Sequence, residues 1–269
     1  MISINTNYGS LFAAKSAGAA QKTMNNAMER LSSGLRINNA KDDAAGQGIA
    51  TRITAQIQGL EMASRNASDA QAMIDTAEAA HQEVHVMLLR MREIAVQASN
   101  GTLRAADRTA LNEEIGALEK EIKNISDNTT FAGLQVNAST QTVFQIGTGS
   151  SNTLTVIFKD FDTSAIGADV GMTTAGTARS ALTKIDAAIS TISTRRGELG
   201  AFSNRLSSTI ANLDNISVNL ASARGRIQDT DFAQETSNLA KSQIMQQAAT
   251  AMLAQANASK GTILTLIKS

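Results

Sequence analysis

Apolar and small residues recur along most of the chain in alternating steps of four and three. The first such series is Ala13, Ala17, Ala20, Met24, Ala27 and Leu31. This spacing is a heptad seam, which is typical of helices that pack against other helices. We therefore expect a first helix here, interrupted by the polar stretch ERLSSGLRINNAKDDAAGQGIA at residues 29–50.

A second run of helical periodicity begins near Ile49. Its seven-residue seam is Ile53, Leu60, Ala67, Ile74, His81, Leu88 and Ala95, with a companion seam at Ala63, Ala70, Ala77, Val84, Met91 and Ala98. Asn100-Gly101 is a C-terminal stop signal, so the helix is expected to run to about Ser99. A shorter helix follows, with Leu111, Ile115, Leu118, Ile122 and Ile125 on one face.

The middle of the chain has a different character, because residues 128–176 are rich in Thr, Ser, Gly and Asn. Residues 143–146 and 154–158 predict two strands joined by a Gly/Ser/Asn turn, which is a β-hairpin. The remainder of this region, residues 160–177, is compatible with either loop or strand.

Two further helices are predicted in the C-terminal half. The first repeats one heptad position at Ile185, Ile192, Leu199, Leu206, Leu213, Leu220 and Ile227, while Arg195 and Thr209 are polar exceptions at its companion position. The last helix begins after residues 228–231, where either Asp could serve as the N-cap. Its seam is Met245, Ala249, Met252, Ala256, Ser259, Ile263 and Leu266.

These elements predict a mainly α fold of long antiparallel heptad helices, like a coiled-coil rod, with a small β-hairpin region in the middle of the chain. The terminal helices are narrow and rich in Ala, so each alone buries too little apolar surface to be stable. The chain does not supply enough other partners for them. We therefore infer self-assembly through the two terminal seams.

Composition narrows the classes of function. The chain has 24 basic and 24 acidic residues, so no net field attracts nucleic acid. It lacks Pro, which fits long uninterrupted helices, and it lacks Cys, which excludes a thiol nucleophile or a thiolate metal site. It has no apolar run of about eighteen residues that would insert into a membrane. Lys15 interrupts the apolar stretch near the start, so that stretch is a poor signal peptide.

Candidate chemistry is sparse. His81 and His85 have the i, i+4 spacing of a zinc-ligand pair, but the five residues read HQEVH rather than HExxH. Because His81 falls on the seam, a packing role is favoured over metal binding. No nucleophile is accompanied by a base in a known motif, and no Gly-rich loop joins a strand to a helix. We expect neither enzymatic activity nor a cofactor.

Several longer stretches together resemble one protein family. They are the opening SINTN, the polar stretch quoted above, MREIAVQASNGT, NTTFAG, RRGELGAFSNRL, and NISVNLASARGRIQDTDFAQETSNLAKSQIMQQAATAMLAQANASKGTILTLI. They cover well over half of the chain in the family's order, which makes the match far more specific than one short motif. The chain resembles the bacterial flagellins, in the short form that lacks large outer domains.

This resemblance implies a structural subunit that polymerises into the extracellular flagellar filament, the helical propeller for swimming. It implies four segments: an inner-core helix with its linker at 1–42, rod-domain helices with the hairpin at 43–178, a rod-domain return helix at 179–229, and a C-terminal inner-core helix at 230–269. The implied partners are the chain itself, an export chaperone at the C-terminal helix, and the filament cap and hook-junction proteins. Export is implied to need no cleaved signal peptide.

The resemblance also assigns roles to residues. The inner-core self-assembly set is Ala13, Ala17, Ala20, Met24, Leu31, Met245, Ala249, Met252, Ala256, Ile263 and Leu266. The expected linker contacts are Arg36, Lys41, Asp42 and Asp43, of which Arg36 and Lys41 can pair with acidic groups on another copy. Either Asp42 or Asp43 could cap the next helix. Contact with the innate receptor TLR5 would involve Arg90, Ile94, Gln97 and Glu114, although Leu is more usual where Ile94 stands. The alternative is that these four residues face a neighbouring subunit.

Two rival functions remain open at this stage. One is a hook–filament junction protein, which shares similar terminal helices but matches the return helix less densely. The other is a carbohydrate-binding surface module on the same scaffold, which the low aromatic content of 3% disfavours because few rings are present to stack on sugars.

Overall fold

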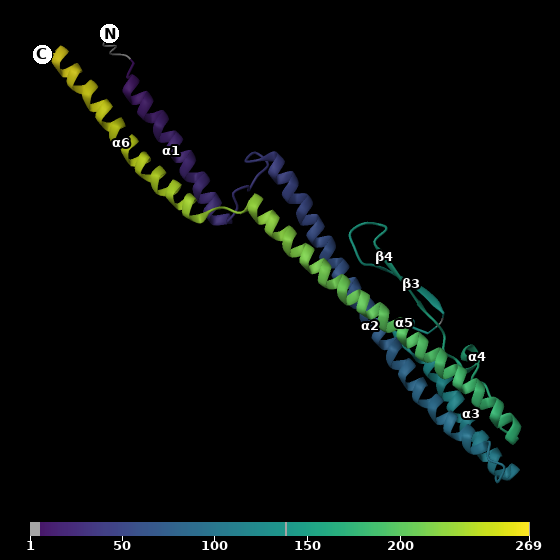
Figure 1. Cartoon of the computed structure of the whole chain (residues 1–269). Coiled ribbons are helices and arrows are strands. Elements are labelled where there is room, and N and C mark those ends of the chain that lie inside the picture. Colours follow the sequence, from purple (N-terminus) through teal and green to yellow (C-terminus); the bar gives the residue numbers. More distant parts are fainter. Residues whose placement is uncertain (1–5, 138, 269) are drawn as a thin grey trace. The chain divides into compact units, whose positions relative to one another are not determined.

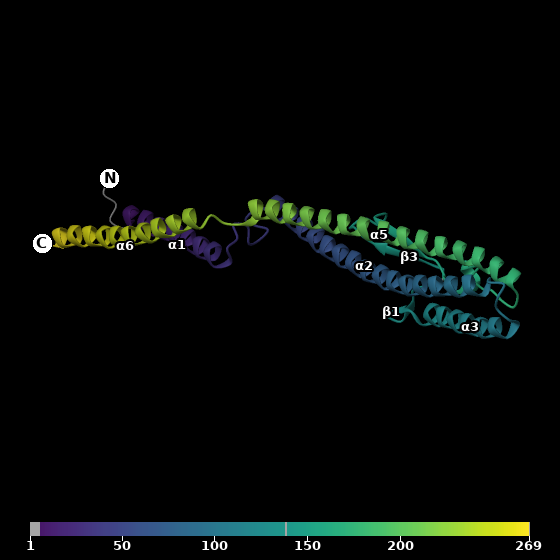
Figure 2. The same cartoon turned by 60° about the horizontal axis from the view of Figure 1, so that its bottom comes forward.

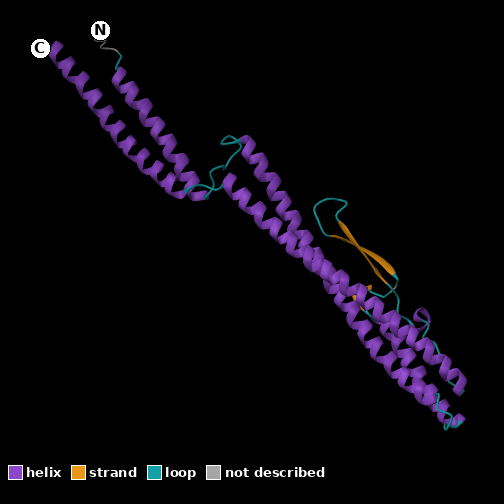
Figure 3. Ribbon diagram, viewed as in Figure 1, coloured by secondary structure: helices purple, strands orange, loops and turns teal. Residues whose placement is uncertain are grey.

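Long helices account for most of the chain (Figures 1 and 3). The structure, a computed structural model, describes residues 6–137 and 139–268, and the side chains of residues 140 and 262–268 fall outside that description. The helices are α1 Tyr8–Ser33, α2 Ala44–Ala98, α3 Ala105–Asn128, α4 Thr163–Ile166, α5 Ala175–Gln228 and α6 Phe232–Lys268. The strands are β1 Thr130–Phe131, β2 Leu134–Gln135, β3 Thr140–Gln145 and β4 Thr153–Phe158. The predicted fold class is confirmed.

The chain divides into two compact units. The terminal unit comprises Met1–Ala55 and Asn219–Ser269, and the central unit comprises Gln56–Val218. In the terminal unit α1 packs along α6, and in the central unit the long helices α2 and α5 pack with α3 and the hairpin. No helix in the described part of the chain is long and apolar enough to cross a membrane.

Helices α2 and α5 run antiparallel in the central unit. Arg92 Nε of α2 lies 2.6 Å from Asp186 Oδ1 of α5, and Arg196 Nη2 of α5 lies 2.6 Å from Glu78 Oε1 of α2. Residue numbers therefore increase along α2 in the direction in which they decrease along α5. The seam residues predicted for α2 within this unit are all buried, as are those of α5 from Ile185 to Leu213. Burial of one heptad face on each helix supplies most of the apolar contact between them.

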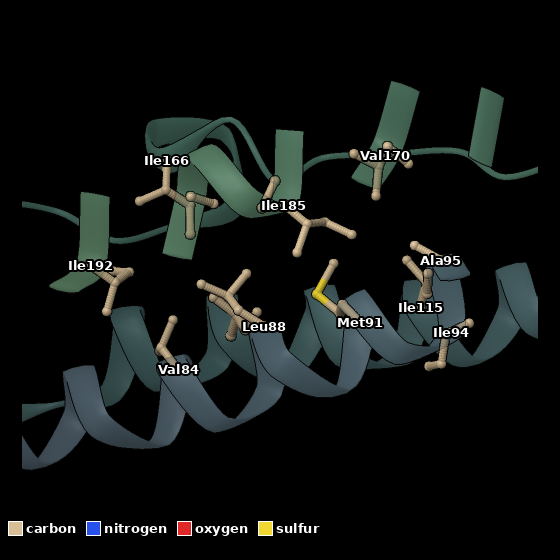
Figure 4. Close-up of a cluster of buried hydrophobic side chains, with 14 of the residues drawn as sticks. Val84, Leu88, Met91, Ile94, Ala95, Ile115, Ile166, Val170, Ile185 and Ile192 are labelled. Atoms are coloured by element: carbon tan, nitrogen blue, oxygen red, sulfur yellow. The ribbon is translucent and has the colours of Figure 1, made fainter. Parts of the chain in front are cut away.

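A first core cluster joins α2, α3 and α5 (Figure 4). Leu88, Met91 and Ile94 come from α2, Ile115 comes from α3, and Ile185 comes from α5. Helix α3 lies alongside α2, as the second view shows (Figure 2). These side chains are fully buried, so the core is continuous across three helices rather than confined to a two-helix seam.

The segment that the sequence left open between loop and strand covers this core. It contains the short helix α4 and then residues 167–174, which form no regular secondary structure, with Ala168, Val170 and Met172 buried at alternate positions. Side chains of α3 hold it in place, because the Val170 N–H donates to Glu119 Oε1 at 2.9 Å and the Met172 N–H donates to Asn112 Oδ1 at 2.8 Å. Burial raises the pKa of the Glu119 carboxyl.

The predicted hairpin is present as β3 and β4, paired antiparallel from Thr140↔Phe158 to Gln145↔Thr153. A shorter antiparallel pair, β1–β2, precedes it. Leu154, Val156 and Phe158 point into a second core cluster with α2 and α5, whereas Ile157 is exposed. The tip of the hairpin approaches α2 closely, since a Cβ built on Gly59 would lie only 2.7 Å from Thr148 Cγ2.

His81 is a buried polar residue in the α2 seam, 2% exposed. Its Nδ1 lies 2.7 Å from the Ala77 carbonyl oxygen, and its ring packs edge-on against Phe161 with centroids 4.7 Å apart. Burial lowers the pKa of its imidazole, and the nearby guanidinium of Arg195 acts in the same direction. Within the described residues no group of three or more metal-ligating side chains includes it.

Candidate self-assembly interface

The terminal unit is built on an antiparallel pair of helices, α1 and α6 (Figures 1 and 2). Three contacts mark the register of the pair. Asn7 Nδ2 donates to the Ala256 carbonyl at 3.0 Å, Gln246 donates to Gln21, and Arg30 Nη1 lies 3.7 Å from Glu235 Oε1. Asn7 also caps α1, because its side chain accepts the Ser10 N–H at 3.2 Å. With this cap, α1 begins at Tyr8, several residues before Ala13, the first residue of the predicted seam.

The seam between these two helices is made of small and polar side chains. On α1 the buried residues are Ala13, Ala20 and Ala27, spaced seven apart. On α6 the buried residues Glu235, Ser242 and Ala249 repeat with the same spacing. Small side chains let the helices approach closely but contribute little apolar area, about 25 cal/mol for each Å² removed from water. The pair therefore gains little stability from its own interior.

Large apolar side chains lie instead on the outside of the pair. The exposed residues of this kind are Tyr8, Leu11, Phe12 and Met28 of α1, and Phe232, Ile244, Met245 and Met252 of α6. Phe12 is 74% exposed and Met252 is 66% exposed. Phe12 and Met252 line an open groove of about 440 Å³ between the two helices, together with Met245, Ala249 and Ala256. Exposed apolar patches are typical of surfaces that bind another protein, a membrane or a ligand.

The predicted self-assembly residues therefore fall into four groups. Ala13, Ala20 and Ala249 are buried within the pair, and Ala17, Met24, Leu31 and Ala256 are half-buried along it. Met245 and Met252 are exposed on the groove. Ile263 and Leu266 fall among the residues whose side chains are not described.

The inward face of α6 is more polar than the apolar seam predicted for it. Periodicity placed Met245 and Met252 on one seam with Ala249, whereas the face that meets α1 carries Glu235, Ser242 and Gln246. A search for apolar periodicity cannot find a polar seam. The available signal was the exact seven-residue spacing of Glu235, Ser242, Ala249 and Ala256. Phe12 was also missed, since it stands outside the alanine seam.

The acidic residues of the linker after α1 accept hydrogen bonds from backbone N–H groups of the same chain. Asp43 caps α2, because its Oδ1 accepts the Gly46 N–H at 2.9 Å. Asp42 Oδ2 accepts the backbone N–H groups of Asn39 at 3.0 Å and Asn38 at 3.2 Å. The bond from Asn39 is the main cause that lowers the pKa of the Asp42 carboxyl. Asp43 thus fixes where α2 begins, as expected of one of these two residues.

The basic linker residues behave differently from each other. Arg36 Nη2 donates to the Ile227 carbonyl at 2.6 Å, near the end of α5, and the Arg36 backbone N–H donates to the Gln228 carbonyl at 2.7 Å. Arg36 therefore binds carbonyl oxygens of its own chain. Lys41 is exposed, and its charge contributes to lowering the pKa of Asp42.

The four residues assigned to receptor contact do not share one exposed face. Arg90 and Glu114 are joined across α2 and α3, with Arg90 Nη2 and Nε at 2.8 and 3.1 Å from Glu114 Oε1, and Gln97 is exposed nearby on α2. Ile94 is only 1% exposed and packs in the core with Ile115 (Figure 4). Because α3 covers this side of α2, the Ile94 side chain is not available to a partner at the surface.

Comparison with known proteins places these features in context. Residues 4–142 match the bacterial flagellin N-terminal helical region, and residues 182–267 match the bacterial flagellin C-terminal helical region. The chain is 43% identical over 270 residues to a flagellin of Halalkalibacterium halodurans, covering 98% of this chain and 99% of that one. It is 40% identical over 287 residues to a flagellin of Bacillus subtilis, covering 93% of each. The crystal structure of Bacillus cereus flagellin superposes with a TM-score of 0.52 at 31% identity, over 60% of this chain and 94% of that chain.

Proposed function

Because this chain belongs to the bacterial flagellin family, and is therefore a structural subunit that polymerises into the flagellar filament used for swimming, we propose that α1 and α6 carry the polymerisation. Flagellins form an extracellular homopolymer, so each subunit meets identical neighbours. In this proposal residues 1–42 and 230–269 form the inner core of the filament. Residues 43–178 and 179–229 form the rod domain outside it.

One observation carries the proposal: the eight exposed large apolar side chains named above lie outside the seam that α1 and α6 share. Phe12 and Met252 are mostly exposed beside an apolar groove, while the seam itself holds Ala, Ser and Glu. Covering these side chains with helices of other copies would remove apolar area from water in each subunit. Helical assembly uses heterologous contacts that never close, so growth can continue indefinitely.

The test compares exposed apolar residues on the two units. Phe12→Ser and Met252→Ser are expected to raise the critical concentration for polymerisation, whereas Leu134→Ser on β2, where Leu134 is 62% exposed, is expected to leave it near the wild-type value. Sedimentation of seeded protein and electron microscopy measure the polymer. Deleting about forty residues from each end should leave a soluble helical monomer. Normal filaments from that truncated protein would disprove the assignment.

We further propose that the exposed stripe of α6 binds an export chaperone before secretion. Met245 and Met252 present flexible apolar side chains, a chemistry that suits transient helix-in-groove binding. A chaperone bound to this stripe would also prevent premature polymerisation. Export itself is proposed to proceed on an unfolded chain without a cleaved signal, followed by assembly next to the cap and hook-junction proteins. Met252→Ser should weaken chaperone binding, and Leu134→Ser should not.

Recognition by TLR5 is proposed for the face formed by Arg90, Gln97 and Glu114. Their exposure, and the pairing of Arg90 with Glu114 across two helices, support a preorganised polar contact. Ile94 would act only from beneath, by holding α3 against α2. Arg90→Ala should reduce receptor signalling by soluble monomers more than Ile94→Val does. We also propose that the protein has no catalytic activity and binds neither nucleic acid nor a cofactor.

A further inference from the structure

The turn between α2 and α3 holds the single Asn-Gly pair of the chain, Asn100-Gly101. In such a pair the backbone nitrogen of the Gly can attack the Cγ atom of the Asn side chain and expel the amide nitrogen as ammonia. Gly favours this attack because it has no Cβ to crowd its nitrogen. Both residues are exposed, and beyond its chain neighbours a Cβ built on Gly101 would meet no atom within 4 Å. The turn therefore has room for the reaction and for water.

The Asn100 side chain is folded toward the peptide bond with which it would react. Its Oδ1 accepts the Thr102 N–H at 3.2 Å, which brings the side chain back over the backbone that follows it. The same bond polarises the Cγ carbonyl. When the Gly101 nitrogen adds to Cγ, negative charge collects on Oδ1, and a backbone N–H that already points at this oxygen stabilises the charge.

The attacking nitrogen is free and its peptide is activated. Among the described residues no acceptor takes the Gly101 N–H. The oxygen of the same peptide, the Asn100 carbonyl, accepts Arg108 Nη2 at 2.8 Å and the Leu103 N–H at 3.4 Å. Loss of the Gly101 proton spreads negative charge over the nitrogen and this oxygen. A guanidinium bonded to the oxygen stabilises the anion, so it increases the fraction of reactive nitrogen at a given pH.

Arg108 is in place before the reaction begins. Its Nε donates to the Ala98 carbonyl at 2.9 Å, one of the last carbonyls of α2, which have no partner inside the helix. The side chain is half-buried rather than free in solvent. Because its guanidinium is fixed at the end of α2, it does not have to be ordered for each reaction.

Asn128 has the opposite arrangement at another exposed helix end. The N–H of the following residue, Thr129, donates to the Ile125 carbonyl at 3.0 Å, and the Asn128 amide nitrogen donates to the Asn124 carbonyl at 2.9 Å. The attacking nitrogen and the leaving group are therefore both occupied. Asn128 serves as the internal control for a change at Asn100.

We propose that Asn100-Gly101 is a self-modifying site, at which the folded turn converts the Asn100 amide into a carboxylate and Arg108 is the activating residue. Hydroxide takes the Gly101 N–H proton, and the nitrogen forms a bond to Cγ. The Cγ–Nδ2 bond then breaks, and the nitrogen leaves as ammonia with a proton from water, which regenerates hydroxide. Water opens the resulting cyclic imide at either carbonyl, giving an aspartate or an isoaspartate, and nothing is oxidised or reduced.

The reaction changes both the charge and the backbone of the central unit. Each event adds one negative charge to a chain whose formal net charge is zero. The isoaspartate product also lengthens the backbone of the turn by one carbon, and this turn leads into α3, which covers the core around Ile94 and Ile115. We expect older protein to be more acidic. All residues of the site lie in the central unit, so the inference does not depend on how the terminal helices assemble.

The test follows the full-length protein during incubation at mildly alkaline pH, once folded and once unfolded in guanidinium chloride. Peptide mass spectrometry measures the mass gain at Asn100 and at Asn128, and chromatography separates the aspartate and isoaspartate peptides. The folded protein is expected to react faster at Asn100 than the unfolded protein and to leave Asn128 unchanged. Gly101→Ala, whose Cβ has room, should fold normally and react at Asn100 no faster than wild type does at Asn128.

Substitution of Arg108 separates activation from support of the turn. Arg108→Gln should slow the reaction of the folded protein about tenfold, the effect of losing one charge-assisted hydrogen bond, and should leave the unfolded protein unchanged. Arg108→Lys keeps a cation and should restore part of the rate. Arg104→Gln removes a neighbouring cation that takes no part in the bonds to the Asn100 carbonyl, and it should have no effect. If Arg108 only supported the turn, its loss would loosen the turn and speed the reaction.

Three results would overturn the proposal. The first is a reaction in the folded protein that is no faster than in the unfolded protein. The second is a wild-type rate in Gly101→Ala. The third is an unchanged or faster reaction in Arg108→Gln while its circular dichroism and thermal melting match those of wild type. If Arg108→Gln did not fold, the comparison of folded with unfolded wild type would still decide whether the turn promotes the reaction.

Discussion

Leu88 offers a direct test of the three-helix core of the central unit. Its side chain is 0% exposed and lies among residues of α2, α3 and α5 (Figure 4). The neighbouring Leu89, on the same helix, is 43% exposed. The substitutions Leu88→Ala and Leu89→Ala therefore remove the same atoms from a closed core and from a solvated surface. Helix propensity changes equally in the two, so the difference isolates packing.

The magnitude follows from burial. Removing three carbon atoms at about 0.8 kcal/mol for each buried CH₂ costs about 2.4 kcal/mol, and the cavity left behind brings the loss to about 3 kcal/mol. For Leu89→Ala the loss should stay below about 1 kcal/mol, because much of that side chain is already in water. At about 2–4 °C per kcal/mol for a unit of this size, Leu88→Ala should lower the Tm by about 6–12 °C.

The assay is thermal and urea unfolding of the monomeric full-length protein, followed by far-ultraviolet circular dichroism. The terminal and central units can melt separately, so the comparison uses the transition that Leu88→Ala shifts and asks whether Leu89→Ala shifts it too. Equal losses in the two variants would refute the reasoning. A loss below about 1 kcal/mol in Leu88→Ala would show that the three helices do not pack as described.

Four further substitutions test other parts of the central unit. Gly59→Ala should loosen the hairpin tip and speed hydrogen exchange of residues 146–152, and unchanged exchange there would contradict the close approach of the tip to α2. Gly116→Ala, where a Cβ meets open space, should instead stabilise α3 by up to about 1 kcal/mol. The pKa of His81 is lowered in the folded protein, so its contribution to stability is complete above the unfolded-state pKa near 6.5 and is lost as the pH falls through the folded-state value. His81→Phe should therefore flatten the dependence of Tm on pH between about 7 and about 5. An unchanged slope would disprove this expectation. The pKa of Glu119 is raised, so its ionisation opposes folding as the pH rises above about 4.5. Glu119→Gln should remove this loss of stability with rising pH, and it keeps an oxygen that accepts the Val170 N–H. Thermal melting as a function of pH measures the difference.

The helices and the hairpin could be predicted because their signals are local. A seven-residue spacing places one face of a helix against a partner whatever that partner is, so Ile74, Leu88 and Leu206 were identified as seam residues and all three are buried. Asp43 and Asp231 could likewise be proposed as caps, because a cap bonds to backbone only two or three residues away. The alternation along residues 154–158 indicated a strand for the same reason.

The segment at 167–174 could not be predicted, because its alternation is short and acquires meaning only from the core that it covers. Ala168, Val170 and Met172 are buried, and α3 offers side-chain acceptors for the backbone N–H groups of Val170 and Met172. Ile94 was assigned with Arg90 to receptor contact by the family resemblance. The structure buries it because α3 lies against that face of α2.

The sequence by itself determined the number and order of the long helices and the buried faces of α2 and α5, since periodicity is a property of the chain alone. Only the tertiary structure decided what each face meets. It placed a polar seam between α1 and α6, left Phe12 and Met252 outside it, and joined Gly34 to Thr230 across almost two hundred residues of sequence. The physical reason is that hydrogen bonds and close contacts between distant segments depend on distances in space, which spacing along a chain does not encode.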